Sequence, residues 1–215
     1  MKYEISETEI ENLVIKQLNN IFYISENETV YIKPQINKAL KRTERCFKKN
    51  SNKYYNRNGE TYFNPFHSGQ YSIFLYYLSN TIFKDIKNNT LSDRIYYLNK
   101  MLNGLDLYYE IQLPDIFMLD HPVGSVMGRA KYGNYFSFSQ NCTVGNNKGY
   151  FPTIGENVKM LSNSKVIGKS IIGNNVILSA NSYVKDENIP DNHIVFGSSP
   201  NLILKPHSLI LNKKL

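Results

Sequence analysis

The chain has 215 residues, of which 41% are hydrophobic and 20% charged, with a mean hydropathy of −0.41 and a formal net charge of +7. This length can bury a substantial core in one large or two small domains. No apolar run reaches the roughly 18 residues of a membrane span, and the first residues are acidic, so we expect neither a membrane span nor a signal peptide. Two distant cysteines, Cys46 and Cys142, exclude a disulfide framework and a cysteine zinc site. We therefore expect a soluble cytoplasmic protein with reduced thiols.

The first hundred residues follow the period of helices. Ser6 and Glu9 have the spacing of a capping box, which predicts the start of a first helix. Its apolar stripe comprises Ile10, Leu13, Val14, Leu18, Ile21 and Phe22. Pro34 fits the first turn of a second helix. The apolar face of that helix comprises Ile36, Ala39, Leu40, Thr43 and Phe47.

A long loop is expected over residues 50–67, followed by two more helices. Their apolar positions are Tyr71, Phe74, Leu75, Leu78 and Ile82 in the third helix and Leu91, Ile95, Leu98 and Leu102 in the fourth. Gly104 is placed to end the fourth helix as a C-cap. Residues 1–104 are therefore predicted to form an α-helical N-terminal domain.

Positive charge is concentrated between Lys33 and Arg57, a stretch that contains nine Lys or Arg residues and a single acidic residue, Glu44. Such a stretch can follow a phosphate backbone, but no nucleic-acid motif accompanies it, so a solvated helix face is the favoured interpretation. The 28 asparagines are interpreted as a compositional bias without chemistry of their own.

After Gly104 the period of the sequence changes to six. Aliphatic residues recur every six positions at Ile154, Met160, Val166, Ile172, Leu178 and Val184. Small or β-branched residues follow four positions after the first five of them, at Val158, Ser164, Ser170, Val176 and Ser182. The register extends backwards through Val144, Phe138, Tyr132 and Val126, with a four-residue insertion between Val144 and Ile154.

This six-residue period predicts a left-handed parallel β-helix, because each hexapeptide forms one flat face and about 18 residues complete a triangular coil. The predicted fold class is mainly β, with the β-helix domain over residues 105–205, preceded by the helical domain and followed by a C-terminal tail over residues 206–215. The flat faces need covering, which favours a homotrimer of side-by-side prisms, with a dimer of trimers as the alternative.

Only one of the four histidines lies among the early repeats. His67, His193 and His207 are interpreted as structural or solvated, and no histidine pair has metal-ligand spacing, so no metal site is expected. His121 differs because Asp106 precedes it by 15 residues, close to one coil. A carboxylate at that place can orient the imidazole while the other ring nitrogen takes a proton from a hydroxyl.

The segments Met118–Gly128 and Gln140–Gly145, which contain Asp-His-x-x-Gly and Thr-Val-Gly, resemble the catalytic segment of serine acetyltransferases, a branch of the hexapeptide-repeat acyltransferases. The resemblance covers residues 106 to about 200. It implies that His121 is the general base, that Asp106 is its partner and that acetyl-CoA is the acyl donor. Asp120 is a further candidate to face the acceptor, with a coil-corner role as the equal alternative.

The sequence departs from this family where Arg-His-Pro would stand, because Tyr150-Phe151-Pro152 occupies that place. The groups suited to a serine carboxylate are absent, and aromatic rings suit the apolar face of a sugar. We therefore expect O-acetylation of a sugar or surface-glycan hydroxyl. The alternatives are serine O-acetylation, N-acetylation of an amino sugar, and a non-catalytic scaffold whose basic segment 33–57 binds an acidic partner such as an anionic glycan.

Backbone amides at Gly145 and Asn146 are candidates to stabilise the oxyanion. The resemblance implies CoA contacts along the later coils, in a groove between adjacent prisms. The candidate CoA contacts are Ser179, Ala180, Lys185, Ser199 and Lys205. Cys142 could act as a covalent nucleophile, but its small inward place in the repeat favours core packing.

Overall fold

The computed structural model describes residues 1–50 and 52–207. The chain divides into two compact units. The helical unit comprises 1–103 and 107–110, and the β-helix unit comprises 104–106 and the chain from Ile111 onward. Residues 208–215 of the predicted C-terminal tail lie outside the described residues.

The first helix, α1 (Glu7–Ile21), begins as the sequence predicts. The Ser6 hydroxyl accepts a hydrogen bond from the Glu9 amide, and the Ser6 amide donates to the Glu9 carboxylate at 2.8 Å, so the capping box is confirmed. Ile10, Val14 and Leu18 are fully buried. The helix therefore packs through the predicted stripe except at its end, where Ile21 is 40% exposed.

The second helix, α2 (Glu26–Lys48), begins earlier than the sequence analysis predicts. A second capping box, formed by Ser25 and Glu28, fixes its start, so Pro34 lies inside the helix rather than in the first turn. The prediction was wrong because it gave Pro34 more weight than the capping pair. The predicted apolar face, which includes Ile36 and Phe47, is confirmed as buried.

The expected loop over residues 50–67 contains structure that the prediction missed. A short 3-10 helix, η1 (Lys53–Tyr55), leads into strands β2 (Asn56–Arg57) and β3 (Glu60–Phe63), which pair antiparallel. Both Asn58 and Gly59 have positive φ, as a two-residue hairpin turn requires. Strand β1 (Lys2–Tyr3) then adds to β3 in parallel.

Helix α3 (Ser68–Ile86) is the centre of the helical unit. It packs against α2 and α4 (Asn89–Asn103), and an unbroken run of its residues is buried. Two buried side-chain amides donate hydrogen bonds there, that of Asn99 to the Ser72 carbonyl at 3.1 Å and that of Asn80 to the Tyr109 carbonyl at 2.6 Å. Gly104, with φ +64°, follows α4 in the predicted C-cap position.

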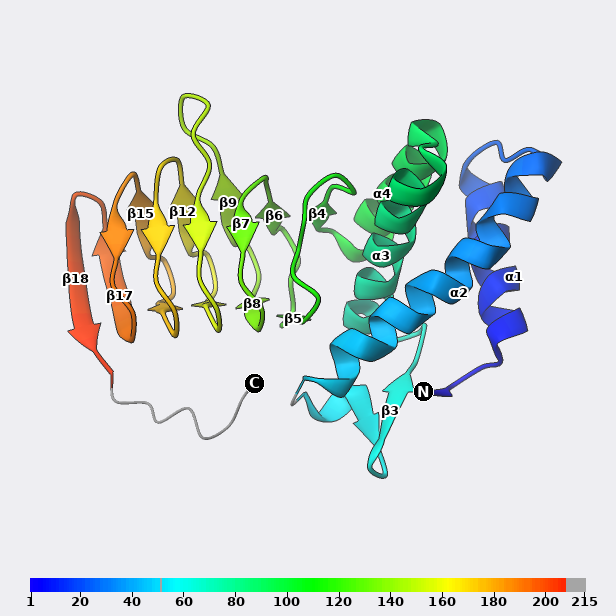
Figure 1. Cartoon of the computed structure of the whole chain (residues 1–215), viewed down its shortest axis with the longest axis horizontal. Coiled ribbons are helices and arrows are strands. Elements are labelled where there is room, and N and C mark those ends of the chain that lie inside the picture. Colours follow the sequence, from blue (N-terminus) through cyan, green and yellow to red (C-terminus); the bar gives the residue numbers. More distant parts are fainter. Residues whose placement is uncertain (51, 208–215) are drawn as a thin grey trace. The chain divides into compact units, whose positions relative to one another are not determined.

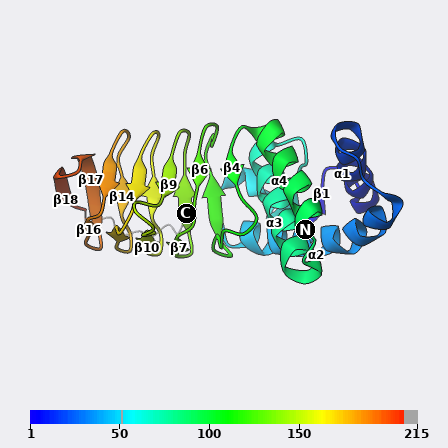
Figure 2. The same cartoon turned by 90° about the horizontal axis from the view of Figure 1, so that it is seen from above.

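The β-helix unit consists of short parallel strands stacked in coils (Figures 1 and 2). Its strands are β4 (Asp106–Leu107), β5 (Phe117–Leu119), β6 (Val126–Met127), β7 (Lys131–Tyr132), β8 (Phe136–Phe138), β9 (Thr143–Gly145), β10 (Thr153–Ile154), β11 (Lys159–Met160), β12 (Lys165–Ile167), β13 (Ile171–Ile172), β14 (Ile177–Leu178), β15 (Tyr183–Lys185), β16 (Asn188–Ile189), β17 (His193–Ser198) and β18 (Asn201–Pro206). They form three faces: β4-β6-β9-β12-β15, β7-β10-β13-β16 and β5-β8-β11-β14-β17. The antiparallel strand β18 pairs with β17 at the last coil.

The coil length agrees with the predicted period. Thr153 pairs with Ile171, and Lys165 with Tyr183, so partners lie 18 residues apart. Every aliphatic repeat position from Val144 to Val184 is at most 2% exposed. The predicted fold class, helices followed by a left-handed parallel β-helix, is confirmed.

The predicted register fails at one early coil. Met127 is buried and pairs with Val144, whereas the predicted inward residue, Val126, is 43% exposed. The turn between Met127 and Tyr132 is one residue shorter than a full hexapeptide, and a shift of one residue moves a side chain to the other face of a strand.

Asparagines have a structural role in the coil turns, contrary to the expectation that they reflect composition alone. Six of them in the β-helix unit adopt positive φ: Asn141, Asn157, Asn163, Asn175, Asn181 and Asn192. Asparagine tolerates this conformation better than most residues. Stacked side chains also join successive coils, since the amide of Asn163 donates to Asn181 at 2.8 Å and that of Asn157 to Asn175 at 2.9 Å.

Candidate active site

The candidate site residues lie on two of the three corners of the coil. Corner A consists of the turns 120–125, 139–142, 161–164 and 179–182, which precede the face β6-β9-β12-β15. Corner B consists of the turns 128–130, 146–152, 168–170 and 186–187, which follow that face. A strand such as β9 separates the two corners by roughly 10 Å, at about 3.3 Å per residue.

His121 lies in an enlarged turn at corner A. Asp120 stacks on Ser139, because the Asp120 amide donates to the Phe138 carbonyl, and Gly124 stacks on Asn141, because the Asn141 amide donates to the Val123 carbonyl. Three residues therefore lie between Asp120 and Gly124. In the equivalent turn of the next coil, only one residue lies between Ser139 and Asn141. The two additional residues make room for the projection of His121, whose φ is +49°.

The His121 side chain is almost fully accessible, with 91% of its surface exposed. Its Nε2 atom lies 4.0 Å from Oδ1 of Asp120, whose side chain is 61% exposed. Within the described part of the chain, His121 makes no hydrogen bond to Asp106.

Asp106 lies on strand β4, in the face β4-β6-β9-β12-β15 that follows corner A. Its amide donates to the Ser125 carbonyl at 2.8 Å, which places Asp106 one coil below Val126, and its side chain is half-buried. The equivalent positions on the next coils, Thr143 and Lys165, also have partly exposed side chains. Asp106 and His121 thus lie at the same end of the β-helix, Asp106 on strand β4 and His121 in a turn, whereas the 15-residue spacing predicted two neighbouring turns.

The other acceptor and oxyanion candidates lie at corner B. Gly145 ends β9, and the Gly168 amide donates to its carbonyl at 2.9 Å, so Asn146 stacks on Gly168. The four-residue insertion then forms a tight hairpin in which Asn147 and Tyr150 exchange backbone hydrogen bonds. We call residues 147–151 the aromatic arm; it projects beyond the neighbouring turns in Figure 1, as the yellow-green loop after β9. Tyr150 is 58% exposed and Phe151 44%.

Asp186 fastens the base of the aromatic arm to the β-helix. Its carboxylate accepts hydrogen bonds from the Lys169 amide at 2.7 Å and from the Asn147 side-chain amide at 2.6 Å. The Lys169 backbone hydrogen bond, helped by the Asn147 amide and by Lys185 and Lys148, lowers the pKa of Asp186. Gly168 leaves room for this contact, because a Cβ atom there would lie 2.0 Å from Oδ1 of Asp186.

The candidate CoA contacts are spread over the later coils. Ser179 and Ala180 lie at corner A, in the same stacked column as Asp120, three coils away and so about 14 Å at the usual strand spacing. Lys185 lies beside corner B, where its amide donates to the Ser199 hydroxyl at 2.9 Å. Lys205 is on β18, with its ammonium 5.5 Å from the Phe196 ring.

The remaining histidines and Cys142 have structural surroundings. His67 caps α3 through Nδ1, Nδ1 of His193 lies 2.7 Å from the Asp191 carbonyl, and Nε2 of His207 lies 2.7 Å from the Asn175 carbonyl. Cys142 is fully buried, with Sγ 3.2 Å from the Leu161 carbonyl. These surroundings agree with the structural interpretations of these residues.

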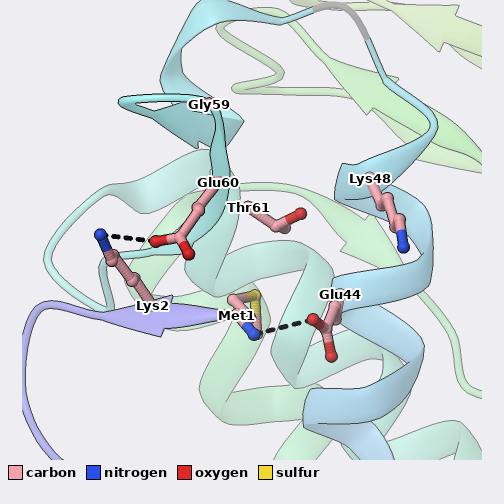
Figure 3. A pocket seen from close by; sticks show the side chains of 7 residues that line it. All are labelled: Met1, Lys2, Glu44, Lys48, Gly59, Glu60 and Thr61. Atoms are coloured by element: carbon pink, nitrogen blue, oxygen red, sulfur yellow. Dashed lines mark hydrogen bonds and ion pairs between the residues drawn. The ribbon is translucent and has the colours of Figure 1, made fainter.

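A separate hollow of about 390 Å³ lies in the helical unit (Figure 3). Its lining residues are Met1, Lys2, Glu44, Lys48, Gly59, Glu60 and Thr61. Glu60 is paired with Lys2 at 2.5 Å and Glu44 with the Met1 ammonium group at 2.7 Å. The hollow contains none of the predicted site residues.

Two absences hold for residues 1–50 and 52–207. None of the helices there is long and apolar enough to cross a membrane. No group of three or more His, Cys, Asp or Glu side chains in the same residues could hold a metal ion.

The sequence analysis missed three contributors to corner B: Asn147, Lys169 and Asp186. The glycine of the Lys148-Gly149 pair is the signal in the sequence that could have identified a hairpin. Both residues adopt positive φ, as a two-residue hairpin turn requires. Asp186 had no comparable signal, because its contact with Asn147 joins residues 39 positions apart. Within one chain, His121 at corner A and the aromatic arm at corner B stay on opposite sides of a face.

Comparison with known proteins agrees with this architecture. Residues 151–186 match the family described as bacterial transferase hexapeptide (six repeats). The serine acetyltransferase CysE of Neisseria gonorrhoeae in complex with serine is similar in structure, with a TM-score of 0.65 and 24% identity over 84% of this chain and 75% of that one. The serine acetyltransferase of Brucella abortus has a TM-score of 0.68 and 16% identity over 86% and 77% of the two chains.

A further serine acetyltransferase structure, in complex with CoA, has a TM-score of 0.66 and 15% identity over 83% of this chain and 76% of that one. A search of the curated proteins finds no significant match. The structural matches show a shared fold. Together with the hexapeptide match, they support the expectation of an acyltransferase.

Proposed function

We propose that this protein is an acetyl-CoA-dependent O-acetyltransferase that modifies a hydroxyl of a sugar or surface glycan. The observation that carries the proposal is the position of His121, which projects almost fully exposed from an enlarged turn of a hexapeptide β-helix. The hexapeptide match and the fold shared with serine acetyltransferases support the transferase class.

In the proposed reaction, His121 is the general base. A ring nitrogen takes the proton of the acceptor hydroxyl as the hydroxyl oxygen bonds to the carbonyl carbon of the thioester. Acetyl-CoA supplies this activated acyl carbon as a substrate. When the carbon–sulfur bond breaks, the His121 imidazolium returns the proton to the leaving thiolate, so the enzyme ends unchanged.

The two nearby carboxylates have different proposed roles. Asp106 stabilises the imidazolium after rotation of the ring, as the family resemblance implies, and Asp120 faces the acceptor. Ser179 and Ala180 continue the column of corner A, which is a path along which CoA can extend from His121. Lys185, Ser199 and Lys205 are proposed CoA contacts farther along the coils.

The separation of the two corners favours a site built between copies of the chain. His121 on one prism and Gly145, Asn146, Tyr150 and Phe151 on another can face the same groove when two prisms lie side by side. We therefore propose a homotrimer, which a sedimentation experiment would contradict if the protein were a monomer at micromolar concentration. Pairing of two trimers through the helical units remains a further prediction.

The aromatic arm distinguishes the sugar proposal from serine acetylation. Tyr150 and Phe151 offer exposed ring faces at the place where the family has its Arg-His pair, and a ring face suits a saccharide better than a small zwitterion such as serine. N-acetylation of an amino sugar requires the same proton transfer and is the second candidate.

The buried thiols of Cys46 and Cys142 agree with a cytoplasmic location.

The decisive experiment measures CoA release with a thiol reagent. Purified protein and acetyl-CoA are combined with L-serine and with a panel of mono- and oligosaccharides. Release that a sugar stimulates establishes the proposal, and detection of an ester rather than an amide product separates O- from N-acetylation. Release with serine alone would replace the sugar proposal by serine acetylation, and the absence of both release and acetyl-CoA binding would favour a scaffold.

A further inference from the structure

The aromatic arm has the rigidity expected of a preformed binding surface. Asn147 and Tyr150 close its hairpin through two backbone hydrogen bonds of 3.0 and 3.1 Å. At the base, the Asp186 carboxylate joins Asn147 to the backbone of Lys169, on the next coil. The rings of the arm are therefore held in position on the β-helix before any ligand arrives, which reduces the entropy lost on binding.

Three lysines lie at the same corner as the arm. The Lys169 ammonium group lies 5.8 Å from the centre of the Tyr150 ring, and Lys148 occupies the tip of the hairpin. Lys185, at the end of β15, is the third lysine at this corner, and all three side chains are exposed. An aromatic face with ammonium groups beside it presents both an apolar and a cationic surface to a ligand.

Lysines outnumber carboxylates at corner B. Within residues 1–50 and 52–207, neither Lys148 nor Lys169 forms an ion pair. The Asp186 carboxylate already accepts two hydrogen bonds from the arm and its base, and one carboxylate oxygen of Glu187 is buried. Three lysines, Lys148, Lys169 and Lys185, thus share corner B with two carboxylates, Asp186 and Glu187, so the corner carries an excess of positive charge.

We infer that the acceptor bound by the aromatic arm is an anionic saccharide, one whose ring stacks on Tyr150 or Phe151 while its carboxylate or phosphate group pairs with Lys169 and Lys148. This inference rests on the proposed function and names the class of its acceptor. Ring stacking alone would accept neutral and charged sugars alike, so the lysines supply the selectivity.

A purely structural role for Lys169 predicts a different behaviour. If its ammonium group served only to steady the Tyr150 ring, removal of the charge would weaken the binding of neutral and anionic acceptors equally. Lys148 separates the two roles more clearly, because it lies at the hairpin tip and no ring contact is described for it. An effect of Lys148 that is confined to anionic acceptors requires direct recognition of the anion.

The test compares acceptors that differ in whether carbon 6 carries a neutral hydroxymethyl group or an anionic group. CoA release is measured with glucose against glucuronic acid, with galactose against galacturonic acid, and with glucose 6-phosphate, for the wild type and for Lys169→Met, Lys148→Met and Lys169→Arg. Lys16→Met, an exposed lysine of α1, is the matched control for a change of net charge. Calorimetric titration of the same sugars into His121→Asn measures binding without turnover.

We expect the anionic member of a pair to have a KM at least about fivefold below that of its neutral partner. Lys169→Met and Lys148→Met should each reduce this ratio by about two- to threefold, the effect of losing one exposed ion pair, and Lys169→Arg should largely preserve it. The preference should also weaken in high salt. Glucose 6-phosphate and glucuronic acid separate recognition of a phosphate from that of a carboxylate.

Two outcomes would overturn the inference while leaving the proposed function intact. Equal KM values for charged and neutral sugars would show that the lysines do not select the acceptor. An unchanged ratio in both lysine variants would show that the selectivity arises elsewhere. In contrast, a wild-type enzyme that acetylates no sugar, together with no saccharide binding to His121→Asn, would refute the proposed function and the inference together.

Discussion

Replacing His121 by asparagine separates the chemistry of the imidazole from the conformation of the turn that carries it. Position 121 has φ +49°, a region that asparagine adopts more readily than most residues and that it already occupies at six other turns of this β-helix. The His121 side chain is 91% exposed and makes no hydrogen bond within the described chain, so its removal leaves no cavity and no buried polar group. We therefore expect the free energy of unfolding to change by less than about 0.5 kcal/mol.

The expected loss of activity is much larger. A general base typically contributes a factor of about 10²–10⁴, so kcat should fall at least about a hundredfold, equivalent to about 2.7 kcal/mol in the barrier. The assay is CoA release at saturating acetyl-CoA and acceptor, with thermal unfolding followed in parallel. His121→Ala is the comparison: it should lose similar activity but also about 1 kcal/mol of stability, because alanine lacks a polar group to support positive φ.

The reasoning would be refuted if His121→Asn retained kcat within about threefold of the wild type and had an unchanged unfolding temperature. His121 would then be an exposed turn residue with no part in proton transfer. If instead the variant lost several kcal/mol of stability, the structural basis of the prediction, an exposed side chain on a tolerant turn, would be wrong.

Three further changes test the remaining assignments. Asp106→Asn should reduce kcat by less than the loss of the base does, since this carboxylate is proposed to orient and stabilise rather than to transfer the proton; an unchanged kcat would remove Asp106 from the mechanism. Cys142→Ala should retain turnover within about twofold and lower the unfolding temperature, because the thiol is fully buried in the core, and loss of turnover by a stably folded variant would instead support a covalent intermediate. Asp186→Asn should lower the unfolding temperature of the protein at pH 7. The folded-state pKa of Asp186 is depressed, so its stabilisation is present above the unfolded pKa of about 4 and is lost as the pH falls through the lower folded value, where the two unfolding curves should converge; a difference that persisted in acid would contradict this assignment.

The sequence alone determined those elements whose signals are local and periodic. The capping box of α1, the apolar stripe of α3 and the six-residue period from Val144 to Val184 each follow from side chains that repeat on one face. Such patterns survive without knowledge of tertiary contacts, because one face must be buried whatever it packs against. The four-residue insertion before Ile154 was visible for the same reason.

Local signals that compete, or that span a single turn, were harder to interpret. Two capping residues, Ser25 and Glu28, determined the start of α2 in place of Pro34, and the Asn58-Gly59 pair made a hairpin where a loop was expected. One missing residue before Tyr132 was enough to turn Met127 inward and Val126 outward. The residues responsible for each of these features can be read from the sequence. Which structure they form depends on which of two competing local preferences is stronger.

Only the tertiary structure decided how the candidate site is distributed. The resemblance named His121, Asp106 and the aromatic pair, but the stacking of coils decided that His121 projects from corner A and that Tyr150 projects from corner B. It also decided that Asp186 reaches back 39 residues to hold Asn147, and that Lys169 lies beside the Tyr150 ring. A hexapeptide period specifies which side chains face the core, whereas the contacts between outward side chains depend on the length of every intervening turn. The sequence therefore determined the β-helix, and the folded coil determined the surroundings of the outward residues on which the proposed chemistry depends.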